Sequence, residues 1–410
     1  MFRKLPWRKV GGFSLLQLFG AIVPLFVLPI LTRIVGAEGW VAIAIGYSMG
    51  GVVAILINFG WSLRGPGIVA SEPEKIASNV YWESNTFRFL LFAPASLCGG
   101  ALATILSTPE YGLLAFAMTI AIGANGLSPA WFFIGRGRPG MIALTDVGPK
   151  VIASLTAIPL LLITGQALLY PIALITAAVL GVCIANKKIL KQLWRPWPEW
   201  RVLGAHGRAQ YGVVLSGLIV AGYGAFSVSL TSIAAGGAVA VVASFAAAVR
   251  LRGMAQAGIS AFSSGFQNWA IEKVEGHFSP RKMWASLAVN SAVGGVVGGV
   301  FIILAPEATP IVFGPEVQIS LMVAVWSGCA CVCYSISASL SYHILAPTGH
   351  LRAIAVSTIA ASAVGVPLLL LMPPRFGAEG AAFAVMAAEL VVVCVQLPRA
   401  LFVLRGLARL

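Results

Sequence analysis

The stretch NKKILKQLWRPWPEWRVLGAHGR, residues 186–208, divides the chain into two parts of similar length. It carries six basic residues and a single acid, Glu199, with three tryptophans among them. Long apolar segments with almost no charge lie on both sides of it. Basic, tryptophan-containing loops of this kind are typical of the cytoplasmic face of a membrane. We therefore expect two membrane-embedded halves joined by a basic cytoplasmic linker.

The composition of the whole chain excludes a soluble protein. Of the 410 residues, 59% are hydrophobic and only 10% are charged, whereas an ordinary soluble domain has roughly 25% charged residues. Segment after segment reaches the roughly 20 apolar residues that cross a bilayer. The net charge of +14 comes from basic residues in short loops, which indicates contact with anionic lipid headgroups and no nucleic acid partner. The expected fold class is an all-α polytopic membrane protein.

About twelve transmembrane helices are expected, in two six-helix bundles related by a pseudo-twofold axis. The N-terminal bundle covers 1–185, the basic cytoplasmic linker 186–210 and the C-terminal bundle 211–410. The basic N-terminus resembles the start of a signal peptide, but the first apolar run is too long for one, so we expect a retained span. The expected spans are 12–34, 40–60, 86–106, 111–134, 141–163, 167–185, 211–234, 238–262, 284–304, 318–341, 352–372 and 379–399.

Two glycine patterns concern symmetry and packing. The tetrapeptide Gly-Ala-Glu-Gly occurs at 36–39 and again at 377–380, which favours an internal duplication. In the ninth span, two overlapping small-xxx-small pairs predict a close approach to a neighbouring helix. These pairs consist of Gly294, Gly295, Gly298 and Gly299.

The distribution of basic residues predicts the orientation of the spans. Nearly all of the 27 Lys and Arg residues fall in the two termini and in alternate loops, and positively charged loops stay in the cytoplasm. Both termini are therefore expected in the cytoplasm. The loops on the opposite side are very short, which counts against an enzyme that acts there, such as a polysaccharide polymerase.

The residue types that carry catalysis show no catalytic pattern. All six cysteines lie in apolar runs, where packing is the expected role, and Cys329, Cys331 and Cys333 point to different faces of a helix. The four histidines lack metal-ligand spacing. No nucleophile elbow, phosphate loop or paired carboxylate pattern occurs. We expect no enzyme, no metal and no cofactor.

Charged residues within the spans are the first candidates for a transport site, because each costs roughly 2.5–3.5 kcal/mol at the centre of a membrane helix. The arginines could instead be anchors that reach the headgroups. Asp146 and Lys150, four residues apart, could neutralise each other. Glu389 could carry a proton, or could hydrogen-bond to a neighbouring helix as a neutral acid.

Several short motifs resemble the oligosaccharide flippase family, the exporters of lipid-linked O-antigen and exopolysaccharide repeat units. The strongest match is LSPAWFFIGRGRPGMIAL (127–144), with Pro129, Trp131 and Gly135 at the exit of the fourth span. At the exit of the second span, where the family commonly has an arginine, Gly67 stands here and Arg64 precedes it. The other matching stretches are PLFVLPILTRIVGAEGW (24–40), INFGWSLRGPGIVA (57–70), VFGPE (312–316), LAPTGHLRA (345–353) and FGAEGAAFAV (376–385).

This resemblance implies a flippase for undecaprenyl-diphosphate-linked oligosaccharide in the cytoplasmic (inner) membrane of a bacterium. The family lies within a superfamily that also contains multidrug antiporters and the lipid II flippase. The partners of such a flippase would be that substrate, membrane lipids and polysaccharide-assembly proteins. A small-molecule or drug cation antiporter and a membrane-embedded polysaccharide polymerase are the alternatives. The candidates for diphosphate binding are Arg88, Arg250, Arg252, Arg64, Arg33 and Lys150, those for ion or proton coupling Asp146 and Glu389, and those for sugar contact Asn58, Asn125, Trp131 and Tyr223.

Overall fold

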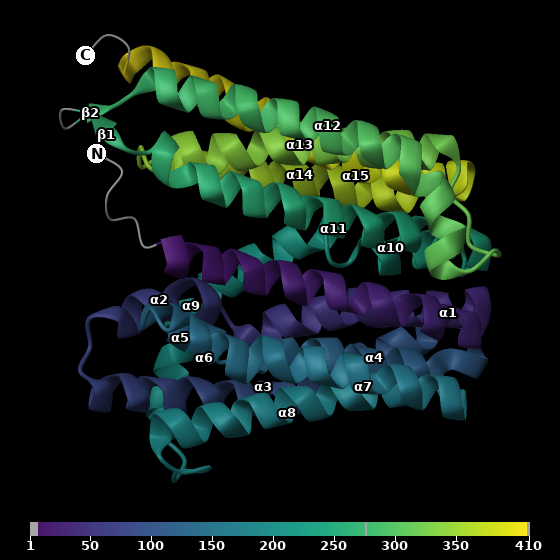
Figure 1. Ribbon diagram of the computed structural model, residues 1–410, viewed down its shortest axis with the longest axis horizontal. Coiled ribbons are helices and arrows are strands. Elements are labelled where there is room, and N and C mark those ends of the chain that lie inside the picture. Colours follow the sequence, from purple (N-terminus) through teal and green to yellow (C-terminus); the bar gives the residue numbers. More distant parts are fainter. Residues whose placement is uncertain (1–6, 275–276, 408–410) are drawn as a thin grey trace. The chain divides into compact units, whose positions relative to one another are not determined.

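A computed structural model describes residues 7–274 and 277–407, and this part of the chain is almost entirely helical (Figure 1). Contacts between Cα atoms divide the chain into two compact units, Met1–Ala221 (unit 1) and Gly222–Leu410 (unit 2). Ten of the described helices are long and apolar enough to cross a membrane, or up to 11 if α9 and α10 form one bent span. The expected all-α membrane fold is confirmed.

Unit 1 contains eight complete helices and most of a ninth. Its longest helix, α1, contains both of the first two expected spans and packs against α3 and α4, while α7 packs against α8. The short elements η1 and η2 are 3₁₀ turns, and η3 is a π-helical turn. The elements are α1 (Trp7–Asn58), α2 (Trp61–Ala70), α3 (Glu74–Leu106), η1 (Pro109–Tyr111), α4 (Gly112–Gly123), η2 (Ala124–Leu127), α5 (Ala130–Gly135), α6 (Pro139–Ile142), η3 (Ala143–Val147), α7 (Gly148–Thr164), α8 (Leu169–Leu190) and α9 (Trp200–Tyr223).

Unit 2 is built from long helices that run lengthwise beside one another, with α13 packed between α12 and α15 and with α14 against α15 (Figure 1). A two-residue antiparallel hairpin, β1–β2, connects α11 to α12. The elements are α10 (Ser227–Ala234), α11 (Val239–Ala270), β1 (Lys273–Val274), β2 (His277–Phe278), α12 (Pro280–Phe313), α13 (Leu321–Ser339), the π-helical turn η4 (Leu340–Leu345), α14 (Leu351–Leu371) and α15 (Pro373–Leu407).

The two Gly-Ala-Glu-Gly motifs have the same local conformation. Each begins with a glycine whose positive φ breaks the helix, 65° at Gly36 and 55° at Gly377, a region that other residues rarely adopt. The fourth glycine permits a close approach in each motif: a Cβ on Gly39 would overlap the side chain of Val35, and one on Gly380 would lie 2.7 Å from the carbonyl oxygen of Met372. The sequence repeat therefore marks two equivalent helix breaks.

Three expected boundaries differ from the structure. The helix α3 begins at Glu74, about three turns before the expected start, because backbone hydrogen bonds continue through polar turns. The helix α12 continues through Pro306 and Pro310 to Phe313, where a loop was expected; neighbouring helices make such prolines tolerable in a membrane. The seventh span, expected to be continuous, is broken between α9 and α10.

One of the two predicted small-xxx-small pairs is confirmed as a packing contact. A Cβ on Gly298 would lie 2.7 Å from the carbonyl oxygen of Gly328 on α13, and a Cβ on Gly294 would lie 2.6 Å from the Cβ of Ser335. Cβ atoms on the other pair, Gly295 and Gly299, would meet no described atom within 4 Å. The first pair therefore sets the spacing of α12 and α13, and the second does not.

We expect Gly298→Ala to lower the free energy of unfolding by about 1–3 kcal/mol, the usual cost of overpacking a well-packed interface. The matched control is Gly299→Ala on the next position of the same helix, which should leave stability unchanged or raise it by about 0.4–1 kcal/mol. Thermal unfolding of both purified variants in detergent measures the difference. Equal effects of the two substitutions would contradict the assigned packing.

Candidate functional site

Unit 1 contains a cavity of about 680 Å³ between the end of α1, the start of α2, η2 and α9. Its volume falls within the range of roughly 300–1,000 Å³ that is usual for small-molecule sites. Two of the predicted sugar contacts, Asn58 and Asn125, line it together. None of the described residues in its lining is charged. The lining consists of Ala54, Ile55, Asn58, Gly60, Ser62, Leu63, Asn125, Gly126, Gly212, Val213, Val214, Ser216 and Gly217.

The turn between α1 and α2 positions Asn58 at this cavity. The helix α1 ends at Asn58, and Phe59 and Gly60 follow with φ values of 48° and 80°. The Oδ1 atom of Asn58 accepts a hydrogen bond of 3.0 Å from the backbone N–H of Ser62 in the first turn of α2. An amide at this position satisfies one of the N–H groups left free at a helix start. A sugar contact would use the amide nitrogen of Asn58 or the second lone pair of its Oδ1 atom.

Arg88 lies directly behind the wall of the cavity and has no exposed surface. Its Nη1 atom donates to the carbonyl oxygens of Gly126 (3.1 Å) and Ser128 (2.9 Å), where the fourth span is broken before Pro129. These hydrogen bonds satisfy carbonyls that the break deprives of helical partners. Contact with a diphosphate, which we predicted for Arg88, would require the fully buried guanidinium to become exposed.

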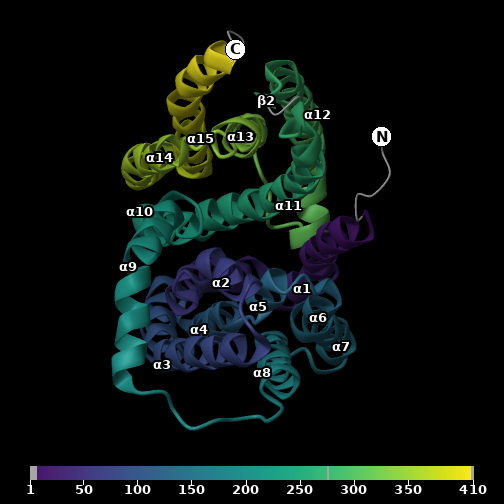
Figure 2. The ribbon, with the colours of Figure 1, turned by 90° about the vertical axis from the view of Figure 1, so that its left-hand side faces the viewer.

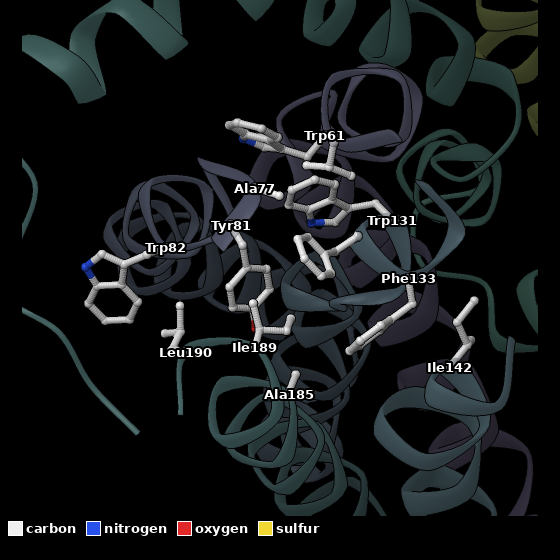
Figure 3. Packing of buried hydrophobic residues seen from close by; sticks show 12 residues of the cluster. Trp61, Ala77, Tyr81, Trp82, Trp131, Phe133, Ile142, Ala185, Ile189 and Leu190 are labelled. Carbon is white, nitrogen blue, oxygen red and sulfur yellow. The ribbon is translucent and has the colours of Figure 1, made fainter. Parts of the chain in front are cut away.

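An aromatic cluster buries Trp131, which we predicted to contact sugar. Its exposed fraction is 1%, and its ring lies 5.2 Å from that of Trp61 and 6.3 Å from that of Tyr81, measured between centroids (Figure 3). The guanidinium carbon of Arg88 lies 6.0 Å from the centre of the Trp131 ring, within cation–π range. In this conformation Trp131 is a core residue, so a sugar contact would need the cluster to open.

Two other predicted diphosphate ligands in unit 1 lie at its surface. Arg64 is exposed on α2, and its Nη1 atom donates to the carbonyl oxygen of Ala209 on α9. Its neighbours in the chain, Ser62 and Leu63, line the cavity, so Arg64 lies near it. Arg33 is exposed on α1 and donates to the carbonyl oxygen of Pro29 one turn earlier, at 3.0 Å.

Asp146 and Lys150 form the predicted pair. The Nζ atom of Lys150 lies 2.7 Å from Oδ1 of Asp146, and both side chains are largely buried. They line a small enclosed space together with Ser128, Pro129 and residues of α8. The proposed proton carrier and the proposed phosphate ligand therefore neutralise each other in this conformation.

A second polar pair in unit 1 was not predicted. The Nε2 atom of His206 on α9 lies 2.8 Å from Oε2 of Glu83 on α3, and the imidazole lies 5.2 Å from the Trp61 ring. This contact attaches the first half of α9 to unit 1. The two residues are 123 positions apart, so no local pattern in the sequence could have paired them.

Three predicted site residues of unit 2 come together in one buried cluster. Arg252 of α11 is 6% exposed and Glu389 of α15 is 9% exposed. Arg252 interacts electrostatically with Glu389, with Tyr223 at the end of α9 and with Cys331 of α13. Arg250, two residues before Arg252, is only partly buried. The candidate diphosphate ligand Arg252 and the candidate coupling residue Glu389 are therefore close enough for their charges to interact, without forming an ion pair.

Comparison with known proteins identifies structures that share the fold of this chain. No family model and no curated protein matches this chain. Among solved structures, the lipid II flippase MurJ in an inward closed conformation has a TM-score of 0.71 at 11% identity, covering 94% of this chain and 87% of that one. The eukaryotic MATE transporter AtDTX14 has a TM-score of 0.60 at 15% identity, with 96% and 94% covered.

A further MATE structure, in a bent conformation, has a TM-score of 0.56 at 16% identity and covers 99% of this chain and 97% of its own. Other neighbours carry the description of MOP superfamily transporters, one of them from Pyrococcus furiosus. The expected relationship is confirmed at the level of fold. This chain has the fold that is shared by the MATE transporters and the lipid II flippase MurJ.

Proposed function

We propose that this protein is a flippase that moves undecaprenyl-diphosphate-linked oligosaccharide from the cytoplasmic to the periplasmic leaflet of a bacterial inner membrane. Transport would proceed by alternating access, with both termini in the cytoplasm, and would supply O-antigen or exopolysaccharide biosynthesis. The observation that carries the proposal is the chemistry of the cavity in unit 1. Its wall combines two side-chain amides and the serines Ser62 and Ser216 with small apolar residues. Such a surface suits hydroxyl-rich sugar rings.

The charges around this cavity favour an anionic lipid headgroup over a drug cation. A cation antiporter needs a carboxylate at its site, and the described lining of the cavity contains none. Two cationic side chains lie next to this wall: Arg88 donates to Gly126 of the cavity wall, and Arg64 follows two lining residues in the chain. A positive potential behind an uncharged wall attracts a diphosphate and repels a cation.

The test is export of lipid-linked oligosaccharide in cells that lack the chromosomal copy and carry a plasmid copy. We expect wild type to restore surface polysaccharide and the double variant Asn58→Leu/Asn125→Leu to lower the export rate on the order of tenfold, because each lost hydrogen bond contributes about 0.5–1.5 kcal/mol. The matched control is Gln166→Leu, which removes an exposed amide in the turn between α7 and α8. It should export normally.

Each alternative function gives a different phenotype in the same strains. Normal polysaccharide together with hypersensitivity to cationic drugs, in cells that lack the protein, would indicate an antiporter instead of a flippase. Single repeat units accumulating on the periplasmic side would indicate a polymerase. Full export by the double asparagine variant, at a normal protein level, would show that the cavity is not part of the transport path.

A further inference from the structure

Residues 191–200 connect α8 to α9 and end at Trp200, the first residue of α9; they form a strap along the edge of unit 1 (Figure 2). Side chains of α3 and α8 hold it through its backbone: Nε1 of Trp82 donates to the carbonyl oxygen of Pro196 at 2.9 Å, and Nδ2 of Asn186 to that of Leu193 at 2.9 Å. Arg195 of the strap donates to Oδ1 of Asn79 at 3.0 Å and to the carbonyl oxygen of Leu190 at 3.3 Å.

This attachment leaves a row of tryptophans exposed. Trp194, Trp197 and Trp200 are exposed by 50%, 50% and 72%. Successive ring centroids are 6.2 Å and 6.5 Å apart, so the three rings form one continuous aromatic surface. Their spacing of three residues, with prolines between them, suits an extended chain in which every third side chain lies along the same edge. The first ring packs edge-on against Trp82, with centroids 4.9 Å apart.

Exposed basic residues flank this aromatic row along the chain. Lys187 and Lys188 at the end of α8, Lys191 in the strap and Arg201 at the start of α9 are all exposed. The only acid in the stretch is Glu199. Lys191 also has a φ of 62°, a left-handed conformation that glycine or asparagine adopts more easily. Arg195 differs from the other basic residues because its guanidinium is engaged with Asn79 and Leu190.

We propose that the strap is a lipid-binding surface, in which the three tryptophan rings lie at headgroup level and the surrounding lysines and Arg201 bind anionic phospholipid. The strap connects two helices at the end of a bundle whose spans cross the bilayer, so its level along the bundle is that of a membrane surface. Tryptophan side chains partition to this interface, and juxtamembrane basic residues attract anionic lipids. This role is independent of the cargo that the protein transports.

The first measurement is tryptophan quenching in the full-length protein in lipid nanodiscs that contain phosphatidylglycerol. Lipids with bromine near the headgroup end of the acyl chain quench rings at the interface, and iodide quenches rings in water. We expect W194F/W197F/W200F, which removes three of the 11 tryptophans, to lower the bromolipid-quenched fluorescence by about a quarter or more. A fall in iodide quenching with unchanged bromolipid quenching would place the strap in water, open to a soluble protein partner, and would overturn the proposal.

The second measurement separates specific lipid binding from general positive charge. In nanodiscs with phosphatidylglycerol, the variant K187Q/K188Q/K191Q should lose most of the bromolipid quenching of the strap tryptophans. Its quenching there should fall to the level that wild type shows in nanodiscs of phosphatidylcholine alone. The control K75Q/R281Q/R352Q removes the same number of exposed positive charges elsewhere and should quench like wild type. Equal losses in both variants would overturn the proposal, and unchanged melting temperatures would show that both variants are folded.

Discussion

Replacing Arg88 by methionine is expected to lower the free energy of unfolding of unit 1 by about 3 kcal/mol, because the carbonyl oxygens of Gly126 and Ser128 would lose their partner in a buried site. Methionine keeps much of the volume of the side chain, so the substitution leaves little empty space. The loss in unfolding free energy therefore comes mainly from the missing hydrogen bonds. The measurement is thermal or denaturant unfolding of the purified protein in detergent. Arg88→Lys should lose less, since it keeps the charge but not the fork of donors.

The matched control is Arg138→Met. Arg138 is about half exposed and lies 3.6 Å from Glu74, and a surface pair of this kind contributes only about 0–1 kcal/mol. A measurement of lipid export distinguishes a structural role of Arg88 from a role in binding the diphosphate. If Arg88 holds the break in the fourth span, stability and lipid export should fall together. A stable Arg88→Lys variant with wild-type melting temperature and no export would instead assign Arg88 to the diphosphate.

Removing one member of the buried cluster in unit 2 should be worse than removing both charges. We expect Arg252→Met to destabilise the protein by about 1–3 kcal/mol, because Glu389 would remain buried without the opposite charge that interacts with it across α11 and α15. The double variant Arg252→Met/Glu389→Gln should recover much of this loss, since no charge then remains to be desolvated. A double-mutant cycle of unfolding free energies measures the coupling.

The surface pair Lys282–Glu272 provides the control cycle. Its charged atoms lie 2.7 Å apart, but the side chain of Glu272 is 63% exposed. Water screens such a pair, so its coupling should stay within about 0–1 kcal/mol. Equal coupling in both cycles would show that burial adds nothing to the interaction of Arg252 with Glu389. Additive effects in the buried cycle would show that the two residues do not act as a unit.

Local patterns in the sequence were sufficient to predict the fold class and the contacts between residues that are close together in the chain. Hydrophobic length alone predicts the spans, because each must cross the same thickness of hydrocarbon. The Asp146–Lys150 pair followed from spacing, since residues four apart lie on one face of a helix. The repeated Gly-Ala-Glu-Gly motif was visible in the sequence, and the first glycine of each copy permits the positive φ that the structure shows there.

The partners of buried polar groups depended on tertiary structure. Arg88 appeared in the sequence as an isolated charge in a span, and only packing brought it to carbonyls 38 and 40 residues away. Glu83 and His206 are in contact because helices far apart in the chain lie together, and Arg252 and Glu389 come within range of electrostatic interaction for the same reason. Gly298 and Gly299 have the same local sequence signal, and only the position of α13 makes one of them a contact.

The sequence by itself determined that this protein is a helical membrane protein and which residues are unusual within it, because the bilayer acts on each span separately. Only the tertiary structure decided which of these residues face a cavity, such as Asn58 and Asn125, and which are used to hold helices together, such as Arg88 and Trp131. The physical reason is that an unpaired polar group in hydrocarbon must find a partner, and the identity of that partner is a property of packing between helices.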